Sequence, residues 1–268
     1  MGATSALRAA EAAAPILLSE VREGIGTLTL NHPARRNALS RAMLTALKEQ
    51  LVQFAADPQV RVVILAARGP VFSSGHDLNE VSGTSLKDAQ TLFALCTEVM
   101  EQIRLLPKPV IAQVQGLASA AGCQLAATCD LVVASSASGF QTPGVRIGLF
   151  CSTPAVPLAR AVSTKKAMEM LLTGEAISPA EAERAGLVNR VVPPESLEEE
   201  TRNFARHIAS FSADTIALGK ATFYRQIPLG HADAYGVAQE TMSCNAVTED
   251  AQEGIKAFLQ KRPPQWKH

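Results

Sequence analysis

Two short runs of small residues hold the groups in this chain that could do chemistry. The first is Ser73–Leu78, where Gly75 permits backbone conformations closed to other residues and can aim peptide N–H groups at one oxygen. The second is Ala118–Gly122, just before a helix-compatible stretch whose first N–H groups have no acceptor within the helix. Two such donors can stabilise negative charge on an oxygen. Taken singly, each run is better explained by a turn or by close helix packing.

The elements that must position these runs alternate along the first half of the chain. Apolar runs bounded by turn residues predict strands, at residues 16–21, 26–30, 60–67, 110–114 and 131–134. Helical spacing predicts helices between them, from an N-cap at Ser40 to Asp57, over 92–106 and over 121–128. Residues 68–84 are expected to form a Gly/Ser-rich loop. The alternation predicts an α/β layered core.

The chain after residue 153 turns mostly helical. Helices are expected at residues 165–173, 179–185 and 197–210, at least two more within 213–258, and an isolated strand at 188–192. No charge block or low-complexity linker divides the chain. We therefore expect a core over residues 16–195 and a packed helical region over residues 196–268.

Composition argues against several classes of protein. Lys+Arg and Asp+Glu are both 25, and zero net charge argues against broad attraction to nucleic acid or anionic membrane. No apolar run reaches the length of a membrane span. The five cysteines form no C-x-x-C pair and no His-Glu-x-x-His occurs, so we expect no metal site, no disulfide framework and a reducing compartment. A nucleotide-binding module finds no support, because neither G-x-G-x-x-G nor G-x-x-x-x-G-K-[ST] occurs.

Residues 1–15 are rich in Ala and lack the basic start and long apolar stretch of a secretory signal. They are either the remainder of a processed targeting segment or a disordered lead-in. The sequence favours the second interpretation.

Several motifs follow one another in a characteristic order. They are Phe72-Ser-Ser-Gly-His-Asp-Leu78, Lys108-Pro-Val-Ile-Ala-Gln-Val-Gln-Gly116, Ala120-Ala-Gly-Cys-Gln-Leu-Ala-Ala-Thr-Cys-Asp130, Phe140-Gln-Thr-Pro143, Leu171-Leu-Thr-Gly-Glu175 and Ala182-Glu-Arg-Ala-Gly-Leu-Val-Asn189. Their order and spacing closely resemble the crotonase (enoyl-CoA hydratase/isomerase) superfamily, over residues 17–262. The resemblance implies a crotonase-like spiral of ββα units. It also implies that the C-terminal helices pack subunits into a homotrimer or a dimer of trimers.

The same resemblance implies an acyl-CoA thioester as ligand or substrate, no permanently bound cofactor, and a role in fatty-acid or lipid metabolism. It implies the mitochondrial matrix, although a transit segment is apparently absent from this chain. The backbone N–H groups of His76 and Ala121 would form an oxyanion hole around the thioester carbonyl. Ser74, Asp77 and Leu78 would line the adenine and pantetheine site.

Further residues are placed near CoA by the resemblance, each with an alternative left open. Arg35 or Arg36 could meet the CoA phosphates or form a solvated charged pair. Phe258, Lys261 and Arg262 match the place where a neighbouring subunit often completes the CoA site. Lys261 and Arg262 are equally explained as part of a soluble tail.

The chain departs from the hydratase pattern at its reactive positions. Gln124 and Gly144 stand where hydratases carry the glutamates that activate water and deliver a proton. Ser152 stands where dienoyl-CoA isomerase-like members place an aspartate, and serine is a poor base unaided. His76 replaces a frequent alanine, and methylmalonyl-CoA decarboxylase-like members share its Gly-His-Asp sequence. Its side chain could donate a proton or hydrogen bond, or could turn to solvent or pack over CoA.

Three functions remain open on the sequence alone. The first is an acyl-CoA-binding protein without enoyl-CoA hydratase activity. The second is an enzyme of another type, a malonyl-type CoA decarboxylase, thioester hydrolase or isomerase that uses the same oxyanion hole. The third is a structural oligomer with a vestigial site, which the retained loops disfavour. Placing glutamate at positions 124 and 144 together is the constructive test that the sequence suggests.

Overall fold

The strands form two sheets that the chain visits in turn. The computed structural model describes residues 15–267, so the expectation for residues 1–14 lies outside the described part. The larger sheet has the order β1-β2-β3-β5-β7-β9 and the smaller has the order β4-β6-β8. The larger sheet comprises β1 Leu17–Arg22, β2 Ile25–Leu30, β3 Val62–Ala67, β5 Val110–Val114, β7 Leu131–Ser135 and β9 Arg190–Val192. The smaller comprises β4 Val71–Ser73, β6 Leu117–Ser119 and β8 Gly139–Gln141.

Each turn of the chain places one strand in each sheet and then adds a helix. β3 and β4 precede α3 (Leu78–Val81) and α4 (Leu86–Leu105), and β5 and β6 precede α5 (Ala121–Thr128). β7 and β8 precede a short η2 (Pro143–Ile147) and then α6 (Ser152–Ala161). Strands β3, β5 and β7 pair in parallel, as do β4, β6 and β8. This arrangement confirms the predicted spiral of ββα units.

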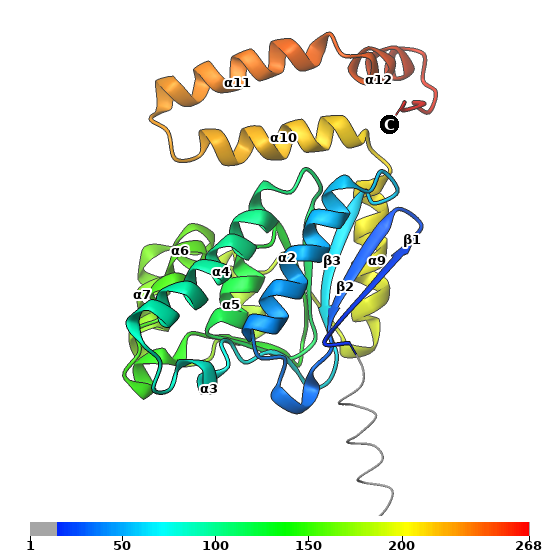
Figure 1. The fold of residues 1–268 in the computed structure, drawn as a ribbon. Coiled ribbons are helices and arrows are strands. Elements are labelled where there is room, and N and C mark those ends of the chain that lie inside the picture. The colour runs from blue at the N-terminus through cyan, green and yellow to red at the C-terminus, as the bar shows by residue number, and fades with distance from the viewer. Residues whose placement is uncertain (1–14, 268) are drawn as a thin grey trace, which may run out of the picture.

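Helices cover both faces of the larger sheet (Figure 1). α2 (Arg41–Ala56) begins at the predicted cap, where the Ser40 Oγ accepts a hydrogen bond from the Met43 N–H at 3.3 Å. It buries one face that includes Leu44, Leu47 and Phe54 in the main core. α9 (Leu197–Ala209) lies on the opposite face of the sheet and covers a second apolar cluster. No helix among residues 15–267 is long and apolar enough to cross a membrane.

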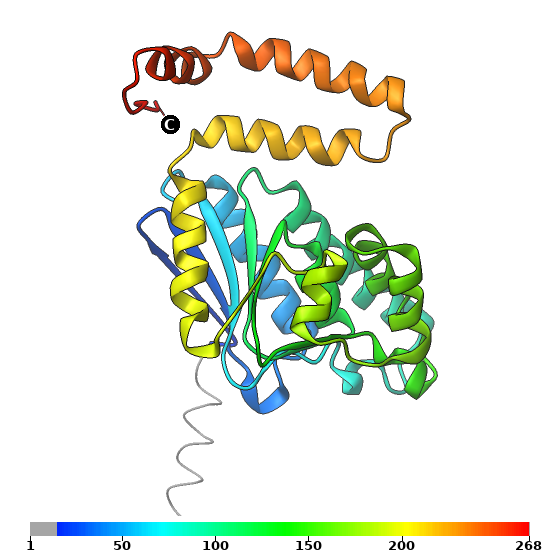
Figure 2. The same ribbon diagram turned by 180° about the vertical axis from the view of Figure 1, so that it is seen from behind.

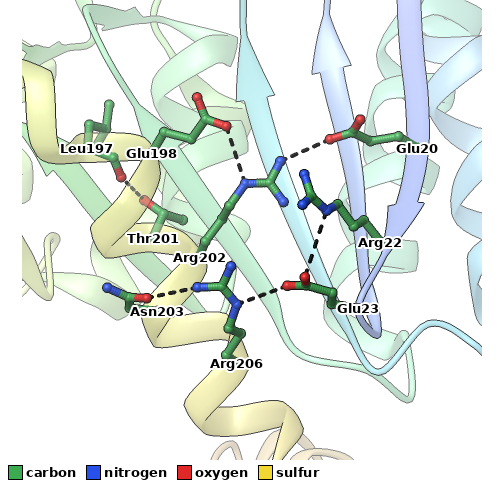
Figure 3. Close-up of polar contacts among 9 residues, drawn as sticks. All are labelled: Glu20, Arg22, Glu23, Leu197, Glu198, Thr201, Arg202, Asn203 and Arg206. Carbon is green, nitrogen blue, oxygen red and sulfur yellow. Dashed lines mark hydrogen bonds and ion pairs between the residues drawn. The ribbon is translucent and has the colours of Figure 1, made fainter.

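Ion pairs also join α9 to the β1–β2 hairpin (Figure 3). Arg202 lies 3.0 Å from Glu20 and 3.2 Å from Glu198, while Arg206 lies 3.2 Å from Glu23. Exposed pairs of this kind contribute little, typically about 0.2–1 kcal/mol each. The apolar cluster beneath α9 therefore contributes most of the stabilisation between α9 and the sheet.

Three helices extend beyond one end of the sheets (Figures 1 and 2). We call residues 211–267, which contain α10 (Ala213–Gln226), α11 (His231–Ala246) and α12 (Glu249–Leu259), the arm. α10 and α11 contain no buried residue. The arm closes on itself, because the Trp266 Nε1 donates to the Ser210 carbonyl at 2.8 Å and Arg262 pairs with Glu253 at 2.6 Å.

Some elements differ from the sequence expectation. The loop expected over residues 68–84 contains β4 and α3, and the helix expected from residue 92 begins at residue 86. The strand expected to be isolated is β9, which pairs in parallel with β7 at the edge of the larger sheet. β6 and β8 were not predicted. The remaining elements are η1 Pro33–Arg35, α7 Thr164–Thr173, α8 Pro179–Ala185 and η3 Pro194–Ser196.

Candidate functional site

The loop after β4 is held by hydrogen bonds to the segment that precedes α2. The Ser73 Oγ donates to the Asn37 carbonyl at 2.8 Å, and the Leu39 N–H donates to the Gly75 carbonyl at 2.8 Å. Gly75 has a φ of 88°, a left-handed conformation that favours glycine. The turn at Gly75 therefore holds the peptide group that carries the His76 N–H.

Two glycines let this loop touch the start of α5. A Cβ on Gly75 would lie 2.9 Å from the Ala120 Cβ and 3.0 Å from the Ala121 nitrogen. A Cβ on Gly122 would lie 2.3 Å from the Ser73 carbonyl oxygen. Only hydrogen fits at either position. The contact brings the segment that carries the His76 N–H against the segment that carries the Ala121 N–H.

The backbone at the start of α5 is strained in a way that exposes donors. Ala120 has φ 50° and ψ −118°, a conformation that costs a non-glycine residue about 1–3 kcal/mol and clusters at functional sites. The Ala120 N–H donates to the Gln141 carbonyl at 2.9 Å. Ala121 is the first residue of α5, and N–H groups of a first turn have no acceptor within their helix. The Ala121 N–H can therefore serve a ligand.

A groove of about 410 Å³ opens beside this contact. It is lined by six residues that the sequence singled out, namely Arg35, Arg36, Ser74, His76, Asp77 and Leu78. The groove is also lined by residues to which the sequence analysis gave no individual role, namely Ala38, Val71, Leu117, Ser119 and Gln141. Ser119 and Gln141 are partners in the β6–β8 register, and the Gln141 Nε2 donates to the Ser119 Oγ at 3.1 Å. The smaller sheet therefore forms one wall of the groove.

Charge at the groove is set by two arginines and one carboxylate. Arg36 and Asn37 both have positive φ values, 51° and 50°, so the chain turns sharply where the arginines lie. The Asp77 carboxylate accepts hydrogen bonds from the Asn79 N–H at 3.0 Å and the Asn79 Nδ2 at 2.7 Å. These bonds, with Arg35 nearby, lower the pKa of Asp77. Asp77 is engaged as the N-cap of α3. Arg35 and Arg36 are side chains of the kind that binds phosphate groups.

The His76 imidazole is half-buried and neutral in character. Burial lowers the pKa of His76, and this effect exceeds the opposing influence of the Leu39 carbonyl and Glu80. The His76 Nδ1 lies 3.4 Å from the Leu39 carbonyl oxygen, to which it donates in the tautomer that carries the proton on Nδ1. The buried Nε2 has no partner within the described residues. Phe93 packs edge-on against the ring at 5.1 Å.

Positions 124 and 144, where the resemblance to hydratases would place glutamates, hold a glutamine and a glycine. Gln124 is buried in α5, and its Oε1 has no hydrogen-bond partner within the described residues. Gly144 lies in η2, where a Cβ would lie 2.1 Å from the Leu149 carbonyl oxygen and 2.8 Å from the Cys151 Sγ. No side chain fits there without a change of backbone. Placing glutamate at positions 124 and 144 together, as the sequence suggested, is therefore ruled out as a clean test.

Ser152 and the arm residues do not join the groove of the same chain. Ser152 is exposed at the first position of α6, and its hydroxyl lies 3.4 Å from the Phe150 carbonyl. Phe258 is 83% exposed on α12, and Lys261 follows that helix with a φ of 55°. α12 and α3 lie at opposite ends of the molecule (Figure 1). Phe258 and Lys261 therefore stand apart from the groove of the same chain.

Comparison with known proteins places this geometry in a family. A family model described as Enoyl-CoA hydratase/isomerase matches residues 20–268. Enoyl-CoA hydratase domain-containing protein 3, mitochondrial, from Rattus norvegicus is 54% identical over 248 residues, which are 92% of this chain and 83% of the rat protein. The Homo sapiens protein of the same name is 52% identical over 247 residues, 92% of this chain and 82% of the human protein.

Solved structures agree with this placement. The crystal structure of human enoyl Coenzyme A hydratase domain-containing protein 3 has a TM-score of 0.91 at 50% identity, covering 94% of this chain and 100% of that one. The crystal structure of an enoyl-CoA hydratase from Mycobacterium smegmatis has a TM-score of 0.93 at 49% identity, covering 95% of this chain and 100% of that one. The chain has the crotonase fold, and it belongs to the enoyl-CoA hydratase/isomerase family.

Proposed function

We propose that this protein binds an acyl-CoA thioester in the groove and lacks enoyl-CoA hydratase activity. The observation that carries the proposal is the glycine contact between the two loops, which brings the backbone next to His76 against the backbone at the start of α5. Paired peptide donors of this kind suit a thioester carbonyl oxygen and any negative charge that develops on it. No permanently bound cofactor is needed for this role.

The rest of the groove supports a CoA ligand. Arg35 and Arg36 stand at the groove with charge for phosphates, and Ser74 and Leu78 offer polar and apolar contacts to adenine and pantetheine. Asp77 is the one carboxylate among the described residues that line the groove, and it already caps α3. The cationic side chains therefore dominate the part of the groove assigned to phosphate.

The absence of hydratase activity follows from Gln124 and Gly144. Hydration of an enoyl thioester needs one group to activate water and another to supply a proton. The Gln124 amide does neither, and the backbone around Gly144 leaves no space for a side chain. This part of the proposal is the most direct to test. Relatives are named as hydratases, whereas Gln124 and Gly144 lack the groups that hydration needs.

Thermal unfolding with added acyl-CoA tests the binding proposal. A ligand that binds only the native state at 100 times its Kd stabilises by about 2.7 kcal/mol. Butyryl-, octanoyl- and palmitoyl-CoA should each be scanned up to near-millimolar concentration, with Arg35→Ala/Arg36→Ala as the weakened variant. Exposed Arg160, on α6 and away from the groove lining, provides the matched control as Arg160→Ala. Absence of any shift with all three thioesters would refute binding.

Decarboxylation of a malonyl-type thioester is the second candidate function. Loss of CO₂ produces the enolate directly, so the two N–H donors can act without a base, and one such donor is worth about 2.7–4 kcal/mol. The proton that completes the product would come from water or from the His76 ring, whose Nε2 has no partner within the described residues. Thioester hydrolysis by a cysteine is disfavoured, since burial raises the pKa of Cys123 to about 12.

The decarboxylation assay is release of CO₂ from malonyl-, methylmalonyl- and ethylmalonyl-CoA. Release above the uncatalysed rate, unchanged in His76→Ala, is the expected signature of catalysis by peptide donors alone. A rate equal to the uncatalysed one for all three substrates removes this candidate and leaves acyl-CoA binding.

The arm supports assembly into a homotrimer or a dimer of trimers. Large apolar side chains stand exposed on it, including Phe223, Tyr235, Met242, Phe258 and Leu259. Apolar surface of this kind marks interaction sites. In such an assembly Phe258 and Lys261 would reach the groove of a neighbouring copy. Light scattering should give a multiple of three times the 28.3 kDa chain, and a stable monomer at micromolar concentration would contradict it.

A mitochondrial matrix location and a role in fatty-acid metabolism complete the proposal. Their support is that close relatives carry the word mitochondrial in their names. Fractionation of cells that express the protein, with protease protection of intact and ruptured mitochondria, tests the location. Protection that persists after rupture of the outer membrane alone is expected.

A further inference from the structure

A buried polar cluster ties the arm to the two helices that carry the candidate site. The Lys220 Nζ, on α10, donates to the Ile103 carbonyl at 2.9 Å, the Lys108 carbonyl at 3.0 Å and the Asp130 Oδ2 at 2.6 Å. An ammonium has three N–H donors, and all three find an acceptor here. The Lys220 side chain is only 8% exposed. The contact therefore buries a fully hydrogen-bonded ammonium between the arm and the rest of the described structure.

Asp130 receives contacts from two separate elements, α10 and β5. Its Oδ2 also accepts from the Val110 N–H of β5 at 2.7 Å, and its Oδ1 accepts from the Tyr224 hydroxyl of α10 at 2.9 Å. Burial and the Asp130 carboxylate raise the pKa of Tyr224, so the hydroxyl stays a donor. We call Lys220, Asp130 and Tyr224 the Lys220 node. It fixes Asp130 relative to both β5 and the arm.

α5 runs from the site toward this node. Its first residue is Ala121, it carries Gln124, and it ends at Thr128, two residues before Asp130. Eight helical residues span about 12 Å, so the two ends of α5 are joined by a short rigid rod. Gly122 packs on Ser73 at one end, and Asp130 is held just beyond the other.

α4 makes a parallel connection. Its last turn contributes the Ile103 carbonyl to Lys220, and its Phe93 packs against the His76 ring. Ten helical residues separate Phe93 from Ile103, a rise of about 15 Å. Both helices that touch the thioester site are therefore tied to α10 at their far ends.

We propose that Lys220 is a positioning residue that holds α5 in place from the arm, and with it the Ala121 N–H of the thioester site. The inference rests on the proposed acyl-CoA function for its ligand readout. It predicts that arm placement and thioester recognition are coupled, although the arm of the same chain lies far from the groove (Figure 1). Couplings of this kind typically change affinity by about 5- to 150-fold.

The test compares two ligands that differ at the carbonyl alone. Butyryl-CoA presents a thioester oxygen to the two N–H groups, whereas the thioether S-butyl-CoA has the same CoA handle and chain without that oxygen. In Lys220→Met the affinity for butyryl-CoA should fall by at least about fivefold, while that for S-butyl-CoA stays within about twofold. Arg225→Met, an exposed change on the same helix, is the control and should leave both affinities unchanged.

Hydrogen exchange supplies a readout that does not depend on any ligand. Amides of residues 124–128, which are hydrogen-bonded within α5, should exchange at least about tenfold faster in Lys220→Met, while amides of β3 keep their protection, because local opening differs from global unfolding. A purely structural role for Lys220 would raise exchange in β3 as well and would weaken both ligands equally. Either of those results overturns the proposal.

A second variant covers the case in which Lys220→Met does not fold, since breaking a buried ion pair leaves an unpaired charge. Tyr224→Phe removes one hydrogen bond to Asp130 and should produce the same pattern at smaller size. If the wild-type chain binds neither ligand, the proposed function fails. The exchange of residues 124–128 then decides the positioning role by itself.

Discussion

The two halves of the candidate site are built in different ways. The half that would bind a carbonyl oxygen consists of peptide groups, held by the close approach of Gly75 to Ala121 and of Gly122 to Ser73. The half that would move protons depends on the side chains at positions 124 and 144. One of these is a buried amide, and the other has no room for a side chain.

The contrast separates recognition from reactivity. Peptide donors keep their place as long as the backbone path is kept, whereas acid–base chemistry is lost with a single side chain. Around Gly144 the Leu149 carbonyl oxygen occupies the space that a Cβ would need. Our proposal that the chain binds a thioester without the chemistry of a hydratase rests on this difference.

The largest effect expected from this contrast is a missing reaction. A general acid and a general base each contribute about 10²–10⁴-fold, so their joint absence should lower hydration by about 10⁴–10⁸-fold. Crotonyl-CoA hydration, followed by loss of absorbance of the conjugated thioester, should stay near background. Turnover typical of a hydratase would show that another residue supplies both roles and would break the comparison.

The next effect concerns the contact that joins the two loops. Gly122→Ala places a methyl group 2.3 Å from the Ser73 carbonyl oxygen and should lower the free energy of unfolding by about 3 kcal/mol. Acyl-CoA binding should fall with it. Gly219→Ala is the matched control, because nothing lies within 4 Å of its Cβ in α10. There alanine should stabilise by up to about 1 kcal/mol. Equal behaviour of the two variants in chemical denaturation would contradict the tight contact.

A smaller effect is expected from restoring one carboxylate. Gln124→Glu keeps the size of the side chain and places an acid in α5, where burial should raise its pKa. Hydration should rise by about 10–10²-fold over the unmodified chain, below the full contribution of two groups. Gln141→Glu adds a carboxylate to the groove wall instead and should give no gain. A gain in both variants would mean that position 124 has no special geometry.

The smallest effect is a dependence of stability on pH. Burial lowers the pKa of His76 in the folded chain, so below its ordinary value of 6.5 the unfolded chain binds the proton more readily. The stability that the neutral ring contributes is full above pH 6.5 and is lost as the pH falls toward the folded pKa. His76→Gln cannot titrate and should lack this dependence of stability on pH. Denaturant unfolding at pH 7.5 and 5.5 gives the change in the free energy of unfolding between the two pH values. An equal change in the wild-type chain and in His76→Gln would contradict the burial of the ring.

Local signals were enough for much of the fold. Ser40 caps α2 and Asp57 follows its last residue, as the sequence predicted, since a cap depends on neighbours in the chain. The strands β6 and β8 were missed because three residues carry no periodic signal. Residues that pair between β6 and β8 lie 22 positions apart in the sequence, as Ser119 and Gln141 do.

The site shows the same division. Motif order was sufficient to gather Arg35, Ser74 and His76 at one groove, because each motif fixes a short stretch of backbone. It could not reveal the crowding of Gly144 by Leu149, which depends on the path of a whole loop. Nor could it reveal the protonation of His76, which depends on burial.

The hydrogen bond that closes the arm affects how the arm carries a load. The hydrogen bond from Trp266 to the Ser210 carbonyl returns the end of the arm to the place where it leaves α9. This bond and the Lys220 node give the arm two attachments to the rest of the molecule, one at Ser210 and one along α10. A load that a partner places on α11 or α12 is therefore shared between both attachments and does not fall on residues 210–212 alone.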